Sequence, residues 1–202
     1  MNKINRKEKK KIFNVRNLVF ISIYLSLFLL AGLTGYFGYI PILHTTITYL
    51  PVIVVIATIH LEFKGALVSG LGFGFSSLIA AYLYGSTRYQ YIDISVLPRL
   101  LMAIFVFLAY KLVNYELRPK LYKFIFLSLL ATELNVILTI SAQYVHNIIS
   151  PLRYILGVRD WAITHVINLV SEPILAIFLS IILYRFVNYM RKKYLYNQKI
   201  KF

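Results

Sequence analysis

Six apolar runs follow one another along the chain, and short polar or charged segments separate them. Most of these runs have about the 20 residues that an α-helix needs to cross a hydrocarbon layer of roughly 30 Å. They do not alternate between apolar and polar positions, as the strands of a membrane barrel would. We therefore predict an all-α integral membrane protein, a six-transmembrane-helix bundle whose helices cover residues 18–39, 45–60, 66–84, 96–113, 124–145 and 162–186.

The second run is the exception, because it is short and carries Pro51 near its start. Proline is tolerated in the first turn of a helix, where a backbone N–H has no helical partner in any case. The connector before it, residues 38–50, is punctuated by Gly38 and Pro41. We expect a structured loop that leads into a short helix.

The composition supports membrane integration, since a mean hydropathy of +0.72 and 59% hydrophobic residues exceed what a soluble core needs. Both ends of the chain are basic. The expected organisation is a basic cytoplasmic N-terminal tail (1–17), a six-helix membrane domain (18–187) and a basic cytoplasmic C-terminal tail (188–202).

The positive charges predict the orientation. With a cytoplasmic N-terminus, the outer segments hold only four of the 22 Lys and Arg residues and the cytoplasmic segments hold the other 18. This asymmetry indicates a multi-pass membrane protein with both termini in the cytoplasm. Topology and attraction to anionic lipid headgroups explain the formal net charge of +15, so we expect membrane lipid and no nucleic acid as a partner. The four outer residues are Arg88, Arg99, Arg153 and Arg159.

Signals for catalysis are weak. Ser76 and Ser77 could supply a nucleophile with His165 as its base, but serines among glycines on a membrane helix are more typical of close packing than of a nucleophile elbow. The chain has no G-x-x-x-x-G-K-[ST] loop, so energy for transport would come from a partner or an ion gradient. The chain also lacks an H-E-x-x-H pair, and its four histidines are scattered over different predicted elements: His44, His60, His146 and His165. We therefore expect no metal site. We also expect that the protein is not an enzyme and needs no cofactor.

Small residues recur four positions apart in two of the predicted helices. One pair is Ala31 and Gly35, and the other is Gly70 and Gly74. Such faces allow another helix to approach closely within a membrane. They predict either a docking face for another membrane protein or close packing inside the bundle.

Ionisable residues inside the apolar runs mark a candidate site. A charge at mid-bilayer costs about 2.5 to 3.5 kcal/mol on insertion scales, so it normally faces a cavity, a partner or a water path. The most prominent is Arg99, whose guanidinium could bind a ligand carboxylate or pair with Glu133 or Glu172. Asn135 and Asn168 lie near these two glutamates, and Asp93 is a weaker candidate. We expect these groups to line one polar chamber.

The order of GYIPI, TYLPVIVVIATI, FKGALVSGLGFGFSSLIAAYL and SVLPRLLMAIFVFLAYKLV resembles the substrate-binding S component of energy-coupling factor (ECF) vitamin transporters. The resemblance extends over the six-helix layout and is best over residues 38–111. One departure is visible before Lys64, where many members carry Gly-Pro and this chain has His60-Leu61-Glu62-Phe63.

The resemblance implies a mechanism. An S component binds a vitamin at its outer side and topples in the membrane, driven by one membrane T component and two ATPase subunits. The helix face that meets the T component corresponds to Ala31 and Gly35, and we add Gly70 and Gly74 as docking candidates. The residues expected to line the vitamin pocket are His44, Thr45, Thr46, Tyr91, Arg99, Asn135, Gln143 and Asn168.

Arg99 favours a ligand that bears a carboxylate. Among vitamins of the family, pantothenate fits best, since it is small and anionic and carries hydroxyl and amide groups. Folate, niacin, biotin and a queuosine precursor remain open, while riboflavin and thiamine are disfavoured. An ion-coupled secondary permease for a small metabolite is the alternative function, although no internal repeat is evident, and an intramembrane hydrolase is a weaker one.

Overall fold

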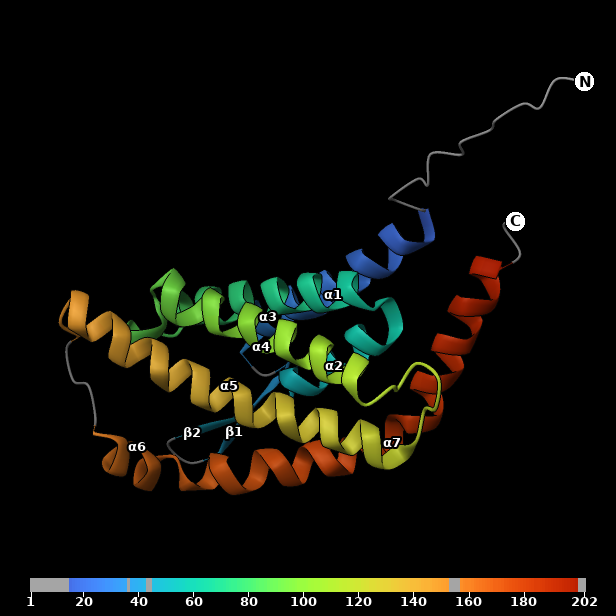
Figure 1. Ribbon diagram of the computed structural model, residues 1–202. Coiled ribbons are helices and arrows are strands. Elements are labelled where there is room, and N and C mark those ends of the chain that lie inside the picture. Colours follow the sequence, from blue (N-terminus) through green and yellow to red (C-terminus); the bar gives the residue numbers. More distant parts are fainter. Residues whose placement is uncertain (1–14, 36, 43–44, 153–156, 200–202) are drawn as a thin grey trace, which may run out of the picture.

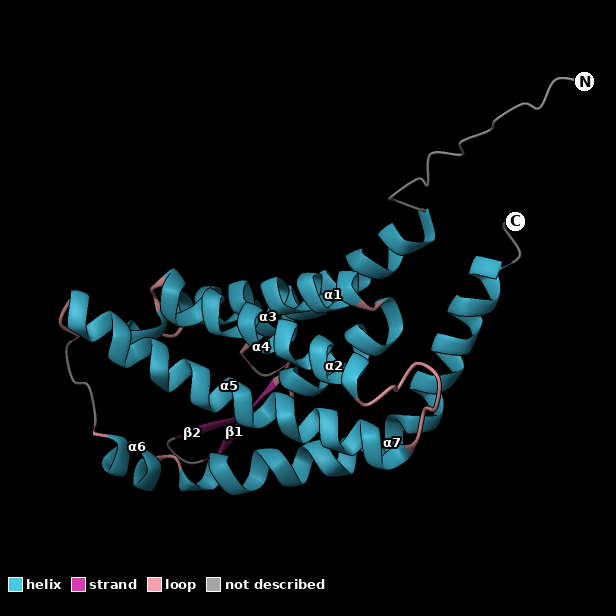
Figure 2. Ribbon diagram, in the orientation of Figure 1, coloured by secondary structure: helices cyan, strands magenta, loops and turns pink. Residues whose placement is uncertain are grey.

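The computed structural model describes residues 15–35, 37–42, 45–152 and 157–199. Figure 1 shows long helices that run side by side and enclose a small β-hairpin, and Figure 2 shows how helical the described chain is. The described elements in chain order are α1 (Val15–Thr34), β1 (Tyr39–Ile42), β2 (Thr45–Thr48), α2 (Leu50–Leu61), α3 (Phe63–Leu83), the 3-10 helix η1 (Thr87–Tyr89), α4 (Ile92–Leu112), α5 (Leu121–Ile149), α6 (Val158–Thr164) and α7 (Val166–Lys199).

Five of these helices, α1, α3, α4, α5 and α7, are long and apolar enough to cross a membrane. Large apolar side chains on their outer faces are exposed, among them Leu33, Ile137 and Phe178. Soluble monomers rarely expose contiguous apolar surface on this scale. The fold is therefore that of a multi-pass helical membrane protein, as the composition predicts.

The first helix ends earlier than the apolar run. The run continues to residue 39, but α1 ends at Thr34 because Gly35 takes up a left-handed conformation, with φ of 64°. Its N–H still donates to the carbonyl of Ala31 at 3.2 Å. A left-handed glycine that closes the last turn is a common way for a helix to end.

The connector between the first two helices is structured, as predicted, and forms an antiparallel hairpin in which Tyr39 lies opposite Thr48. The residues from Thr45 to Thr48 form strand β2 rather than the start of a helix. Three of the four are threonines and the fourth is Ile47, and β-branched side chains favour strands. The predicted short helix follows as α2, with Pro51 in its first turn.

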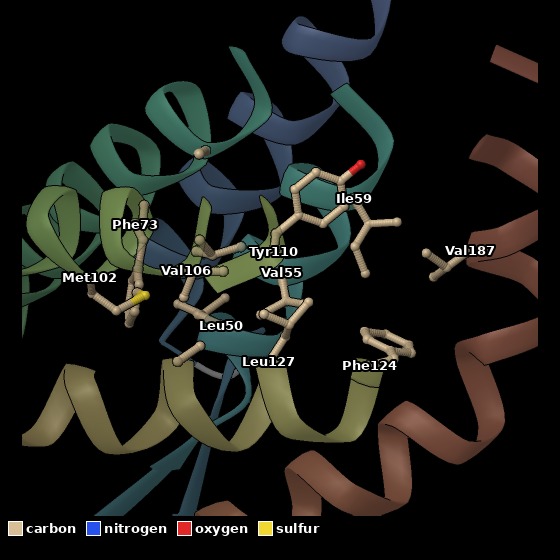
Figure 3. Close-up of a cluster of buried hydrophobic side chains, with 14 of the residues drawn as sticks. Leu50, Val55, Ile59, Phe73, Met102, Val106, Tyr110, Phe124, Leu127 and Val187 are labelled. Carbon is tan, nitrogen blue, oxygen red and sulfur yellow. The ribbon is translucent and has the colours of Figure 1, made fainter. Parts of the chain in front are cut away.

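Helix α2 lies at the centre of the bundle. It has 12 residues and is about 18 Å long, and most of its side chains are buried. Figure 3 shows side chains of α2 gathered with others from α3, α4, α5 and α7. The labelled members of this core are Leu50, Val55, Ile59, Phe73, Met102, Val106, Tyr110, Phe124, Leu127 and Val187.

The small residues expected to dock a partner are used inside the bundle. A Cβ on Gly70 would lie 2.7 Å from the Cβ of Ala103, and a Cβ on Gly74 would lie 2.7 Å from the Cα of Val96. Helix α4 thus occupies the small-residue face of α3. Ala31 is fully buried in the core, and Gly35 abuts the ring of Tyr84. All four positions therefore make packing contacts inside the bundle, and docking of a partner at these faces stays a prediction.

The last apolar run forms two helices rather than one. Helix α6 ends at Thr164, and α7 continues past residue 186 to Lys199, so most of the segment expected as a basic tail is helical. In Figure 1 the second half of α7, drawn in red, changes direction and ends near the beginning of α1. There Arg191 is buried, donates to the carbonyl of Ile59 and lies 3.4 Å from a carboxylate oxygen of Glu62.

Candidate functional site

A cavity of about 510 Å³ opens between the hairpin and the helices, toward the end of the bundle that carries η1 and α6. The charge pattern predicts that this end faces outward. Its walls come from the end of α1, both strands, α3, η1, α4, α5, α6 and α7. The lining residues are Thr34, Gly35, Tyr39, Thr46, Thr48, Ser77, Ala80, Ala81, Tyr84, Ser86, Tyr89, Arg99, Asn135, Val136, Thr139, Trp161, His165, Asn168 and Glu172.

Arg99 is the buried cation of this cavity, with 6% of its surface exposed. Its Nη1 donates to the carbonyl of Ile94 at 2.6 Å, and its guanidinium carbon lies 5.6 Å from the ring centres of both Phe73 and Tyr89. Among the described residues, its Nε has no hydrogen-bond partner and Arg99 forms no ion pair. A buried guanidinium with unused donors is suited to bind an anion.

Glu172 supplies acceptor oxygens to the same cavity and is 5% exposed. Its Oε1 accepts hydrogen bonds from the backbone N–H of Thr48 at 3.0 Å and from Nδ2 of Asn168 at 3.2 Å. Asn168 also donates to the carbonyl of Thr46 at 2.5 Å. These bonds attach the hairpin to α7 and hold the carboxylate in place.

Several buried polar atoms of the cavity wall lack a partner within the described structure. Besides Nε of Arg99, they are the hydroxyl of Tyr39, Oδ1 of Asn135 and Oγ1 of Thr139. Asn135 and Thr139 lie four positions apart on α5 and therefore share one face of the helix. An unpaired buried polar group costs about 1 to 3 kcal/mol. A bound ligand or water with matching groups would recover this cost.

Glu133 does not join the chamber, contrary to the expectation from the sequence. It is exposed, whereas Asn135 is buried and lines the cavity. Residues two positions apart lie on nearly opposite sides of a helix, so both could not face one cavity.

The structure brings together four of the eight residues expected in the pocket. Thr46, Arg99, Asn135 and Asn168 all line the cavity. Thr45 lies in β2, but its side chain is not among the described ones, and His44 lies outside the described residues.

The other two expected residues, Tyr91 and Gln143, belong to a neighbouring cluster. Nε2 of Gln143 lies 3.4 Å from the hydroxyl of Tyr89, which itself lines the cavity. The ring of Tyr91 lies 4.2 Å from that of His146. Nδ1 of His146 lies 2.6 Å from Oδ2 of Asp93 and joins α5 to the start of α4. These residues support the segment around η1 without lining the cavity.

The aromatic part of the cavity wall was not predicted from the sequence. Trp161 and His165 stack with their ring centres 4.3 Å apart and their planes 11° apart, and both line the cavity. Tyr39 and Tyr89 add two further rings. The single tryptophan of the chain and its spacing of four from a histidine were the available signal.

The geometry also bears on the catalytic and metal candidates. Nδ1 of His165 donates to the carbonyl of Trp161 at 3.0 Å, and among the described residues no hydrogen bond joins it to Ser76 or Ser77. In the same part of the chain, no three His, Asp or Glu side chains are grouped so that they could hold a metal ion. No protein-family model matches this sequence, and a search of curated proteins gives no match.

Proposed function

We propose that this chain is the substrate-binding S subunit of an ECF-type importer, which captures a small vitamin, best matched by pantothenate, at the outer face of a bacterial cell membrane. A T component and two ATPase subunits would then drive its delivery to the cytoplasm. The observation that carries the proposal is a buried arginine, Arg99, which lacks a carboxylate partner among the described residues and lines a cavity of about 510 Å³. The assignment to the ECF family rests on the order of the motifs in residues 38–111.

The arrangement of the helices supports six crossings with both termini in the cytoplasm. The beginning of α1 and the end of α7 lie at the same end of the bundle in Figure 1, which requires an even number of crossings. Five helices are long enough to span, so one more crossing is needed. We propose that the hairpin and the short helix α2 together supply it. The asymmetry of Lys and Arg supports a cytoplasmic position for this end.

The chemistry of the cavity supports an anionic ligand with several hydrogen-bonding groups. Its volume lies within the roughly 300 to 1,000 Å³ of sites for small molecules. Arg99 would bind the carboxylate, and the free oxygens of Asn135 and Thr139 can accept hydrogen bonds from hydroxyl or amide groups. Glu172 is a further acceptor. Pantothenate has a carboxylate at one end, hydroxyls at the other and an amide between them.

The binding experiment uses the full chain purified in detergent. Native mass spectrometry would first identify any metabolite that co-purifies, and calorimetric titration would then compare pantothenate with panthenol, which has an alcohol in place of the carboxylate. We expect panthenol to bind about 30-fold more weakly, the loss typical of an unpaired buried charge. Equal affinities would overturn the assignment of an anionic ligand. Folate, niacin and biotin complete the panel.

The transport experiment separates an S subunit from an ion-coupled permease. Proteoliposomes would contain this chain alone or together with a T component and two ATPases from the same organism. We expect uptake of labelled pantothenate only with the partners and ATP. Uptake by this chain alone, driven by a proton or sodium gradient, would contradict the proposal and favour the permease.

A further inference from the structure

A second cavity, of about 260 Å³, lies at the opposite end of the bundle from the candidate ligand site. It is formed where the beginning of α1 meets the end of α2 and the last turns of α7. Its wall includes Arg16, Phe20, His60, Tyr189, Lys193 and Tyr194. The position is the one that the proposed orientation assigns to the cytoplasmic face of the membrane.

The rim of this cavity is basic. Arg16 comes from α1 and Lys193 from α7, and the described lining contains no acidic residue. Neither cation forms an ion pair with a described residue.

The described carboxylates at this end of the bundle are engaged elsewhere. Glu62 lies 3.4 Å from Arg191, and a carboxylate oxygen of Glu116 lies 2.7 Å from Nζ of Lys111. The hydrogen bond from Lys111 also holds the pKa of Glu116 below its ordinary value. Two cations therefore face one hollow with no described counter-ion beside them.

The floor of the cavity is aromatic and firmly held. His60 is buried, its ring lies 4.4 Å from that of Phe20 and 5.4 Å from that of Tyr194, and its Nδ1 lies 3.1 Å from the hydroxyl of Tyr24. Tyr189, at the mouth, is well exposed. Aromatic side chains of this kind are enriched at the interface between membrane and water.

An apolar surface leads away from the basic rim. Val19 and Ile23 are exposed on α1, one and two turns from Arg16, and so continue the same face of the helix toward the bilayer centre. A ligand that contacts both parts needs a negative headgroup and a long apolar portion. A soluble anion would use only the rim.

We propose that this second cavity binds the phosphate headgroup of an anionic phospholipid from the inner leaflet, with the acyl chains along the outer face of α1. Basic pockets between membrane helices on the cytoplasmic side are known to take such headgroups. The proposal rests on the membrane orientation given above, but it does not depend on the vitamin or on the ECF partners.

The test measures lipid binding to the full chain in detergent by native mass spectrometry, with phosphatidylglycerol and phosphatidylcholine as probes. The double variant Arg16→Gln/Lys193→Gln removes the basic rim. Each basic residue near an anionic surface contributes about fivefold to binding, so we expect affinity for phosphatidylglycerol to fall about 25-fold. Binding of phosphatidylcholine should not change.

The matched control is Arg118→Gln/Lys120→Gln, which removes two exposed charges from the α4–α5 loop at the same end of the bundle. We expect it to bind phosphatidylglycerol as the unmodified chain does. The charge-preserving variant Arg16→Lys/Lys193→Arg should also keep the preference. If the double glutamine variant does not fold, the single variants Arg16→Gln and Lys193→Gln serve as the test, and each should lose about fivefold in affinity.

Three outcomes would overturn the proposal. Equal affinity of the unmodified chain for the two lipids would mean that the cavity does not select an anionic headgroup. An equal loss in the control variant would show a general effect of surface charge. Displacement of phosphatidylglycerol by millimolar inorganic phosphate would identify the cavity as a site for soluble anions rather than lipid.

Discussion

Arg99 and Glu172 line the same buried cavity but form no ion pair with each other. Each is held by a different element, because Arg99 donates to the carbonyl of Ile94 in its own helix and Glu172 accepts from Thr48 in the hairpin. An intramembrane charge normally finds a partner. The separation leaves the guanidinium without a carboxylate partner among the described residues, which is the condition that the proposed ligand-binding role needs.

Replacing Arg99 tests this relationship directly. We expect Arg99→Gln to weaken pantothenate binding by about 2 kcal/mol or more, roughly 30-fold, because the ligand carboxylate would lose a buried charge partner. Calorimetric titration in detergent measures the change. Arg88→Gln is the control, since Arg88 lies at the same end of the bundle outside the cavity wall and should leave affinity unchanged. Unchanged affinity in Arg99→Gln would return Arg99 to a structural role.

A substitution of Thr139 tests ligand binding and protein stability separately. Its hydroxyl is buried without a partner among the residues that the structure describes, so we expect Thr139→Val to leave the free energy of unfolding unchanged or to raise it by about 1 kcal/mol. Pantothenate binding should weaken about fivefold, since one neutral hydrogen bond to the ligand is lost. Thermal unfolding without ligand and calorimetric titration give the two readouts.

The control for Thr139 is Thr132→Val on the same helix. Thr132 is buried outside the cavity wall, and its hydroxyl already donates to the carbonyl of Ser128 at 2.9 Å. Its replacement should not change ligand affinity. If Thr139→Val bound pantothenate as tightly as the unmodified chain, the free hydroxyl would have no part in binding.

Gly35 follows the end of α1 and lines the cavity. Its substitution tests the strain of its left-handed backbone conformation and its close packing against Tyr84. Its φ of 64° strains any other residue by about 1 to 2 kcal/mol, and an added Cβ would lie 2.6 Å from the Tyr84 ring. We expect Gly35→Ala to lower the free energy of unfolding by more than Gly85→Ala. Gly85 has a similar φ of 74° and open space around it, so the comparison isolates the contact with Tyr84. Equal losses would mean that the ring moves aside freely.

Gly74 distinguishes internal packing from partner docking. An added Cβ would press on the backbone of Val96, so we expect Gly74→Ala to destabilise the isolated chain by about 1 to 3 kcal/mol. Thermal unfolding of the purified chain measures this. A variant that keeps its stability alone but fails to assemble with a T component would instead identify this face of α3 as a docking surface.

Part of the site could be predicted from the sequence. Arg99, Asn135 and Asn168 stand out as polar residues within apolar runs, and each lies on the cavity wall. The same criterion selected Glu133, which faces outward, because a list of polar residues carries no information about helical face. Trp161 was not predicted, because an aromatic residue in an apolar run does not differ in hydropathy from its neighbours.

Local properties of the chain determined the class of protein. Continuous apolar runs are sufficient to indicate membrane helices. Pro51, which indicates the start of a short helix, and the basic ends, which predict the orientation, are equally local signals. Only the tertiary structure decided that Gly35 ends α1, that Thr45 begins a strand, and that α4 covers the small residues of α3. It also decided the site, where Thr48 meets Glu172 across 124 residues of chain. Hydropathy depends on neighbours in sequence, whereas a cavity depends on which distant side chains pack together and which buried polar atoms remain without a partner.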